Sequence, residues 1–366
     1  MPFDELGAWL RLTLTPGVGN ATARKLLAAF GSAEAVFAAS QGALTAVAGD
    51  RLARALQTPV DTEAAEAVQR WLDADSRHHL LTLGDPDYPP ALLETSDPPL
   101  MLYALGQRDV LAHPRKLAMV GSRNPTPQGA ENARQFAQAL AERGLCVVSG
   151  LALGVDGAAH EGALQAGGPT IAVVGTGLDR VYPRRHLKLA HRIADQGLLL
   201  SEYALGTAPL APNFPKRNRI IAGLSLGTLV VEAAVQSGSL ITAHLAVEMG
   251  REVFAIPGSI HSPQARGCHA LIRQGAKLVE SAQDILEDLH LATDVGARHA
   301  ASDPSSAAAP EAPLLQALGH DPASLDALQA RTGLDTAALQ AELLNLELEG
   351  AVQRLPGGLF QRLVTA

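Results

Sequence analysis

Between residues 116 and 256 the chain alternates regularly between short apolar runs and longer amphipathic segments. This alternation is typical of parallel βαβ units, in which a helix connects each strand to the next. The apolar runs contain few polar residues, so helices must cover both faces of the sheet. The predicted strands span residues 116–121, 145–149, 170–175, 198–202, 229–232 and 252–256, with a short edge strand at 277–279. We therefore expect an α/β fold with a doubly wound, mainly parallel sheet.

A helical unit is expected before the sheet, over residues 1–77. A Gly-Val-Gly turn at residues 17–19 precedes an apolar-periodic helix, with Asn20 as its expected N-cap. This pattern looks like a helix-hairpin-helix, in a domain that we describe as SAM- or helix-hairpin-helix-like, and a fainter echo follows at residues 44–56. Whether the hairpin contacts DNA or only packs against protein stays open. The Pro-rich residues 84–99 favour an extended connector.

A second small unit is expected after the sheet. We place the sheet domain at 78–290, a flexible linker rich in Ala, Ser and Pro at 291–313, and a C-terminal domain at 314–366. Three predicted helices and a Gly-Gly hairpin in this last part favour a winged-helix module. Its third helix carries Asp335, Glu342, Glu347 and Glu349 but no Lys or Arg, which favours contact with protein over contact with a duplex.

Charge and composition exclude several classes of protein. The 366 residues include 29 Lys and Arg against 37 Asp and Glu, a formal net charge of −8, which excludes binding of nucleic acid by bulk positive charge. A 4% aromatic content argues against a broad base-stacking platform. No long apolar run or basic-then-apolar amino terminus is present, so we expect no membrane span and a cytoplasmic protein. The 2 cysteines predict neither a disulfide nor a metal site, and we expect no metal and no cofactor.

The loops that follow the predicted strands are the expected binding site. In a parallel sheet these loops meet at one edge. They are rich in small residues, which allow backbone amides to approach a ligand, and each opens a helix whose N-terminus attracts anions. The loops cover residues 121–126, 149–156, 175–178, 235–239 and 257–259. The sequence therefore predicts phosphate binding at this edge.

Cations near this edge favour a run of phosphates over a single mononucleotide. The glycine pattern fits neither the dinucleotide fingerprint nor the Walker sequence, so NAD and ATP are weakly supported. Of Arg217 and Arg219, one is expected to be structural and to pair with Glu202 or Glu232. The candidate contact residues are Gly121, Ser122, Arg123, Ser149, Gly150, Arg184, Lys216, Arg217, Asn218, Arg219, Ser237, Gly238 and Ser239.

Catalytic groups are less well supported. Asp156 and His160, four residues apart on a helix, and Glu232 after its strand could form an acid–base set, but no nucleophile or metal accompanies them. We therefore expect no enzyme. The alternative is a nucleotide phosphoribohydrolase of the lysine-decarboxylase-like type, which also has a Gly-Ser-Arg loop and a glutamate after a strand. That family has a Pro-Gly-Gly-x-Gly-Thr motif before its glutamate, whereas here Glu232 follows Gly227-Thr-Leu-Val-Val.

Several motifs in order over about residues 81–276 resemble the DprA (DNA processing protein A) family. They are Met119-Val-Gly-Ser-Arg123, Ser149-Gly-Leu-Ala-Leu-Gly-Val-Asp-Gly-Ala-Ala-His160, Gly177-Leu-Asp-Arg-Val-Tyr-Pro183, Phe214-Pro-Lys-Arg-Asn-Arg-Ile-Ile-Ala-Gly-Leu-Ser225, Val231-Glu-Ala233, Ser237-Gly-Ser-Leu-Ile-Thr242 and Ile256-Pro-Gly258.

The resemblance implies an extended Rossmann core that binds and protects single-stranded DNA and forms a homodimer. It also implies loading of the RecA recombinase in natural transformation and DNA repair, without enzymatic activity. By position, Arg123 and Lys216 should line the phosphate pocket. Residues 267–276 match the segment implicated in dimerisation, which makes Leu271 and Ile272 contact candidates. At Leu153 the family often has a basic residue, so one contact is expected to be lost here.

Overall fold

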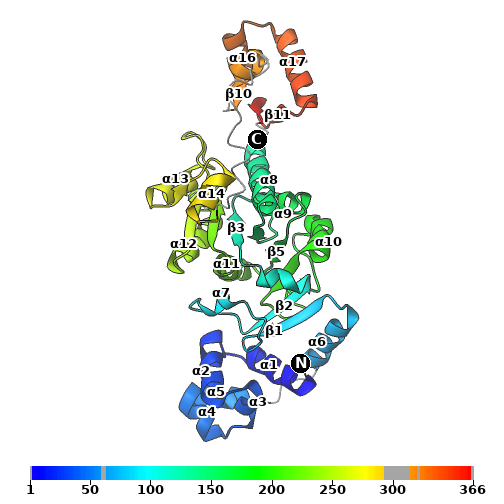
Figure 1. The fold of residues 1–366 in the computed structure, drawn as a ribbon, viewed down its shortest axis with the longest axis vertical. Helices are drawn as coiled ribbons and strands as arrows, with labels where there is room; N and C mark the ends of the chain where they lie inside the picture. The colour runs from blue at the N-terminus through cyan, green and yellow to red at the C-terminus, as the bar shows by residue number, and fades with distance from the viewer. Residues whose placement is uncertain (1, 59–62, 292–312, 320–321, 364–366) are drawn as a thin grey trace.

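The computed structural model describes residues 2–58, 63–291, 313–319 and 322–363 (Figure 1). Its centre is a nine-stranded sheet in the order β1-β2-β6-β5-β4-β3-β7-β8-β9. Strands β3 to β9 all run parallel to one another, whereas β1 and β2 are antiparallel to each other and β2 is antiparallel to β6. The strands are β1 (His78–Thr82), β2 (Met101–Gly106), β3 (Lys116–Val120), β4 (Cys146–Ser149), β5 (Thr170–Val173), β6 (Leu198–Ser201), β7 (Gly227–Val230), β8 (Glu252–Ala255) and β9 (Lys277–Leu278).

The predicted strands β3 to β9 are confirmed, and the fold is the expected doubly wound α/β sheet. Strands β1 and β2 were not predicted, because we interpreted residues 84–99 as a connector and assigned no strand on either side of it. That stretch, with the short helix α7 (Pro90–Leu93), joins these two antiparallel strands. The pair extends the parallel sheet at one edge.

Residue alternation along β3 shows how both faces of the sheet are buried. Leu117 and Met119 belong to the apolar layer under α8 (Pro127–Glu142) and α9 (Val155–Gln165). Ala118 and Val120 belong to the opposite layer, under α11 (Asn213–Leu224) and α12 (Ser239–Glu248). Successive side chains of a strand point to opposite faces, so a strand between two helical layers needs a continuous apolar sequence.

In the described part of residues 1–77, six helices form the N-terminal unit, next to β1 and β2 (Figure 1). They are α1 (Phe3–Leu14), α2 (Asn20–Phe30), α3 (Ala33–Ala38), α4 (Gln41–Ala48), α5 (Asp50–Gln57) and α6 (Glu63–Ala74). The predicted hairpin lies between α1 and α2, and Gly17 has φ +84° there, which glycine adopts without strain. The expected N-cap was wrong by one residue: Gly19 is the N-cap and Asn20 is the first helical residue. This leaves the Asn20 side chain free for contacts outside the helix.

The C-terminal unit is a winged helix, as predicted. Helices α15 (Pro313–Leu318), α16 (Leu325–Thr332) and α17 (Thr336–Leu348) pack with a three-stranded sheet of order β10-β12-β11. The strands are β10 (Ala323–Ser324), β11 (Val352–Leu355) and β12 (Leu359–Arg362). The predicted linker lies almost entirely outside the described residues. No helix in the described part of the chain combines the length and apolarity needed to cross a membrane.

Candidate nucleic-acid interface

The loops after β3, β4 and β7 meet the N-terminal half of α11 around a cavity of about 690 Å³, which we call the first hollow. It brings together eight of the predicted contact residues, namely Gly121, Ser122, Arg123, Arg217, Asn218, Ser237, Gly238 and Ser239. Tyr182, Phe214 and the buried pair Asp156 and Arg217 complete much of its wall. The edge predicted from the strand pattern is therefore a real concave site.

Arg123 and two aromatic rings lie together in the first hollow. The rings of Tyr182 and Phe214 lie 5.5 Å apart between centroids, and the Arg123 guanidinium carbon lies 5.7 Å from the Phe214 centroid. Tyr182 is 47% exposed, and Arg123 is exposed and forms no ion pair among the described residues. An unpaired cation beside two aromatic rings can bind one phosphate and one base together. Neither ring was predicted at the site, although both lie in the motifs quoted above, because the low total aromatic content did not indicate where the few rings lie.

Backbone hydrogen bonds fix the Gly-Ser-Arg loop. The Ser122 amide donates to the Glu232 carbonyl (2.7 Å), and the Val155 amide donates to the Ser122 carbonyl (3.1 Å). Gly121 is required here, since a Cβ atom would lie 2.7 Å from Cγ2 of Val155. The loop is thus held in place before any ligand arrives.

Glu232 points away from the first hollow and caps α8. Its carboxylate accepts hydrogen bonds from the Thr126 amide (2.9 Å) and the Thr126 hydroxyl, and Thr126 is the N-cap of α8. Burial raises the pKa of Glu232. A carboxylate committed to a helix cap is poorly placed to act on a bound nucleotide, which weakens the phosphoribohydrolase alternative.

Asp156 and Arg217 hold the loop after β4 from inside. The Asp156 carboxylate accepts from the amides of Gly150 (3.1 Å) and Ala152 (3.2 Å), and Arg217 donates to the Gly150 carbonyl (2.7 Å) and to the Val173 carbonyl. Between them Leu151 adopts φ +57°, a conformation rare for a residue with a side chain. These contacts preorganise the loop.

Two predicted contact residues are therefore internal. Arg217 is 4% exposed, and burial lowers its pKa to about 10. Ser149 is fully buried, and its hydroxyl donates to the Met119 carbonyl (2.6 Å). Because the polar atoms of these two side chains are already used within the sheet and its loops, we no longer expect them to contact a ligand. Gly150, also a predicted contact residue, is buried and does not line the first hollow, and both its amide and its carbonyl already have internal partners.

Asp156 and His160 do not form an acid–base pair. His160 is fully buried, and its Nδ1 donates to the Thr170 hydroxyl (2.8 Å), which itself donates to the Val147 carbonyl. Burial lowers the pKa of His160 to about 3, so the ring is neutral. Both residues support the fold.

The loop after β7 presents hydroxyl groups to the first hollow. Ser237 Oγ and Ser239 Oγ lie 2.7 Å apart, and Asn218 Nδ2 donates to the Gly238 carbonyl (3.4 Å). Ser239 begins α12, so this loop also brings a helix N-terminus to the site. The loop and α11 are thereby joined across the site.

Lys216 lies on the other side of α11. Positions 214, 217, 218 and 221 share the face toward the first hollow, whereas Lys216 and Arg219 line a separate cavity of about 640 Å³, the second hollow. The expectation that Arg123 and Lys216 line one pocket is wrong. Phe214 faces the first hollow, and the two residues from Phe214 to Lys216 turn the side-chain direction by about 200° around the axis of α11. Lys216 is exposed and forms no ion pair among the described residues.

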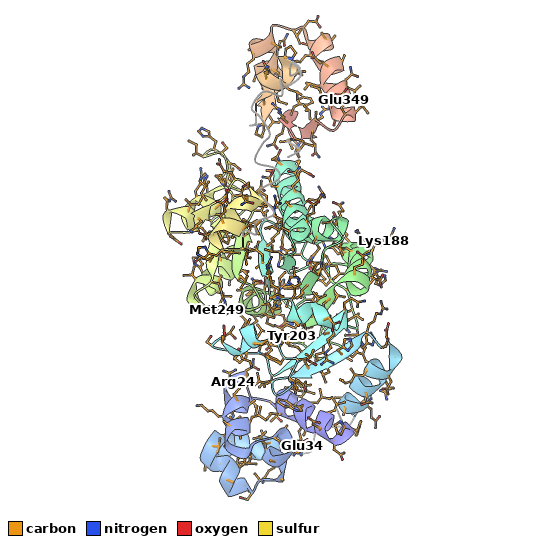
Figure 2. All side chains as sticks on the ribbon, in the orientation of Figure 1. Arg24, Glu34, Lys188, Tyr203, Met249 and Glu349 are labelled. Atoms are coloured by element: carbon orange, nitrogen blue, oxygen red, sulfur yellow. The ribbon has the colours of Figure 1, made fainter. Side chains whose placement is uncertain are left out.

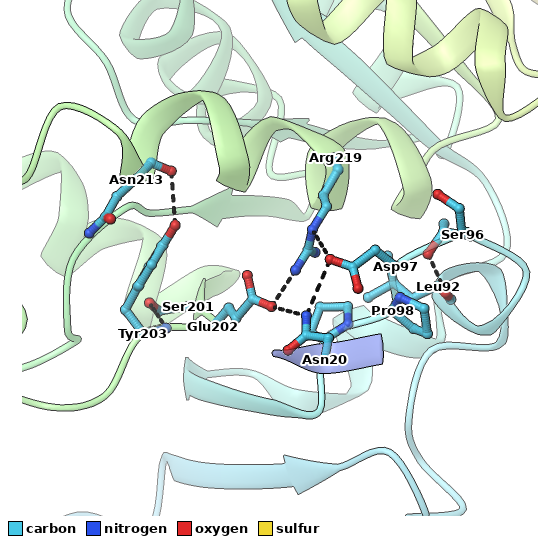
Figure 3. A network of polar contacts seen from close by, with 12 residues as sticks. Asn20, Leu92, Ser96, Asp97, Pro98, Ser201, Glu202, Tyr203, Asn213 and Arg219 are labelled. Atoms are coloured by element: carbon cyan, nitrogen blue, oxygen red, sulfur yellow. Dashed lines mark hydrogen bonds and ion pairs between the residues drawn. The ribbon is translucent and has the colours of Figure 1, made fainter. Parts of the chain in front are cut away.

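A network of charges forms part of the second hollow, where the N-terminal unit meets the sheet domain (Figure 3). Arg219 pairs with Glu202 and with Asp97 (3.3 Å), which confirms that one arginine of this block pairs with Glu202. Asn20 donates to Glu202 (3.1 Å) and Asp97 (3.3 Å), and Arg24 pairs with Asp97 (2.9 Å). The predicted contact residue Arg219 is therefore occupied by an interdomain network.

The remaining predicted residues lie elsewhere. Arg184 is exposed on the short helix η2 (Arg184–His186) and lines neither hollow. Leu271 is 4% exposed in the core, so it offers no surface to a second chain, whereas Ile272 is half-buried. On α13 (Arg266–Arg273) Leu271 faces the sheet. Ile272 is one residue further along the helix, so its side chain points about 100° away and is less buried.

Comparison with known proteins assigns the family. A family model described as DNA recombination-mediator protein A matches residues 79–290. The chain belongs to this family. A DprA winged helix domain matches residues 298–358 and a DprA-like N-terminal HHH domain matches residues 4–66. A DNA-processing, recombination-mediator role follows from membership in the DprA family.

Relatives of the DprA family align over much of the chain. Protein Smf of Escherichia coli K12 is 46% identical over 79% of this chain and 78% of its own length. DNA processing protein DprA of Streptococcus pneumoniae R6 is 52% identical over 56% of this chain and 72% of its own length.

Two solved structures share the fold. DprA from Streptococcus pneumoniae superposes with a TM-score of 0.69 at 40% identity, covering 79% of this chain and 98% of that chain. DprA from Helicobacter pylori, described for a unique single-stranded DNA binding mode, superposes with a TM-score of 0.53 at 34% identity, covering 59% of this chain and 97% of that chain.

Proposed function

We propose that this protein binds single-stranded DNA in the first hollow and acts there as a non-enzymatic mediator that protects the strand and loads the RecA recombinase in natural transformation and DNA repair. The observation that carries the proposal is the exposed, unpaired Arg123 beside the rings of Tyr182 and Phe214, above loops of fixed backbone amides. A single strand offers both phosphates and unstacked bases to such a site, whereas a duplex hides its bases.

The experiment measures the affinity of a labelled oligothymidylate over a series of salt concentrations. For Arg123→Ala we expect weaker binding and a loss of about 0.7 from the slope of log K against log salt concentration, because one phosphate contact is removed. Arg143→Ala is the matched control, since Arg143 is exposed on the sheet domain and lines neither hollow. Equal affinity for the two variants would contradict the proposed site.

Recombinase loading is tested by RecA-dependent strand exchange on DNA that is already covered by a single-strand binding protein. The wild-type protein should remove the delay before exchange, and Arg123→Ala should not. A homodimer fits the apolar residues that are exposed on the edge strand β9 and in the loop after β8, where Leu278 is 50% and Ile260 is 73% exposed. Ile260→Glu with Leu278→Glu should then yield a monomer in sedimentation, while the matched change Leu93→Glu, on the exposed surface of α7, should not.

A further inference from the structure

The segment that follows Tyr182 carries four permanent positive charges on one surface. Arg184, Arg185, Lys188 and Arg192 lie on η2 and α10 (Leu187–Gln196), and all four are exposed. The opposite side of α10 is buried through Leu189, Ala190, Ile193 and Ala194. Figure 2 shows Lys188 on the outer side of this helix. We call these four cations the α10 basic stripe.

The charges of the stripe are not neutralised. None of its four members forms an ion pair among the described residues, whereas Arg77, Arg134 and Arg219 each do. Arg184 and Lys188, and likewise Lys188 and Arg192, are four residues apart, the spacing at which like charges destabilise a helix. In a chain with a formal net charge of −8, such a surface is a local attractor for a polyanion.

The stripe is attached to the first hollow. It begins two residues after Tyr182, which lines that hollow. Nδ1 of His186, between Arg185 and α10, donates to the carbonyl of Leu151 (3.0 Å), so η2 is held against the loop after β4. With a rise of about 1.5 Å per residue, the stripe extends roughly 12 Å from this point. That length accommodates two or more consecutive phosphates.

We propose that the α10 basic stripe binds the backbone of single-stranded DNA where the strand leaves the first hollow past Tyr182. This inference rests on the proposed function, and it assigns Arg185, Lys188 and Arg192 as contacts in addition to the hollow itself. The stripe offers charge without rings, so it binds phosphates without regard to base. It lengthens the occluded site and increases the salt dependence of binding.

The experiment compares two triple variants of equal charge. Arg185→Gln, Lys188→Gln and Arg192→Gln remove three charges from the stripe, and Lys25→Gln, Arg143→Gln and Arg273→Gln remove three exposed cations from other surfaces. With an oligothymidylate of about 20 nucleotides, the stripe variant should lose about 2 from the slope of log K against log salt, or about 0.7 for each phosphate released. Its affinity at low salt should fall at least tenfold, while the control triple should retain the wild-type slope.

Oligonucleotide length separates this inference from the proposed function. With a strand of about 4 nucleotides, which fills the first hollow alone, the stripe variant should bind as the wild type does and Arg123→Ala should not. Equal slopes for the two triples on the long strand would overturn the stripe and leave the first hollow standing. The inference would also be overturned if the stripe variant lost as much affinity for a blunt duplex as for the long single strand, since the stripe would then bind double-stranded DNA. Wild-type binding of both lengths by Arg123→Ala would instead overturn the proposed function.

Discussion

Arg217 lies directly beneath Gly150, with Nη1 donating to the Gly150 carbonyl at 2.7 Å. A Cβ atom at Gly150 would lie 2.3 Å from the same nitrogen, so the loop and the guanidinium fit together only with glycine at this position. Because the loop after β4 joins the first hollow to η2, this contact fixes the geometry of both. A buried cation thus shapes the surface of the first hollow.

Gly150→Ala should destabilise the protein and weaken DNA binding together. The added methyl group displaces the Arg217 guanidinium, and overpacking of this kind costs about 1–3 kcal/mol. The free energy of unfolding from urea titration and the affinity for a single strand measure the two effects. The control is the same change at an open position, Gly84→Ala, where no atom lies within 4 Å of the added Cβ and φ is not positive, so neither stability nor affinity should fall. A stable Gly150→Ala variant with wild-type affinity would show that the contact is dispensable.

The aromatic pair should contribute affinity without salt dependence. Phe214→Ala and Tyr182→Ala should each lower the affinity by about 1–3 kcal/mol, because stacking on a base is lost while the charges remain. The slope of log K against log salt should stay at the wild-type value, in contrast to Arg123→Ala. Phe214→Tyr keeps a ring and is the control. A fall in slope for Phe214→Ala would mean that the ring acts by positioning Arg123 and not by stacking.

Glu202 and Arg219 should couple energetically within the sheet domain, next to the N-terminal unit. Their side chains are 17% and 15% exposed, so solvent screens the pair only partly, and we expect a coupling energy of about 1–2 kcal/mol. A double-mutant cycle with Glu202→Gln and Arg219→Met, followed by thermal unfolding, measures it. The exposed pair Asp50 and Arg54 is the comparison, and its coupling should be much smaller. Additive effects at Glu202 and Arg219 would contradict a cooperative network.

His160 should make the protein less stable in acid. Its folded pKa of about 3 lies below the unfolded value of 6.5, so the unfolded chain binds a proton that the folded chain does not. Above pH 6.5 His160 is neutral in both states and does not lower the free energy of unfolding. As the pH falls from 6.5 toward 3, that free energy decreases by up to about 1.4 kcal/mol per pH unit. His160→Asn, whose amide can replace Nδ1 as the donor to Thr170, should flatten urea stability against pH in that range. An unchanged profile would show that His160 is not the sensor.

The parallel core was predictable because burial on both faces leaves a direct trace in the sequence. Each strand from β3 to β8 is a short, mostly apolar run, and most are followed by a loop rich in small residues, so both the layers and the binding edge follow from that pattern. Strands β1 and β2 left a weaker trace. β1 contains His78 and His79, and β2 directly follows a Pro-rich stretch, so neither matched the pattern of the core.

The individual side chains of the site were less predictable, because the phase of each helix decides where they point. Arg123 was found since it lies in a loop with no helical phase to resolve. Lys216 and Arg217 are adjacent in sequence, yet one is exposed at the second hollow and the other is buried at the first. Contacts between distant segments, such as Asn20 with Glu202, leave no local pattern and needed the structure.

Helix α11 separates the two hollows, with Phe214 and Asn218 on one flank and Lys216 and Arg219 on the other. A single residue inserted or deleted at its start would turn every one of these side chains by about 100°. The residues that line both hollows would then change together. A change of length at this point therefore cannot alter one hollow and leave the other intact. This region can therefore vary by substitution. The loop between β6 and α11 can vary in length only where the same α11 residues continue to face each hollow.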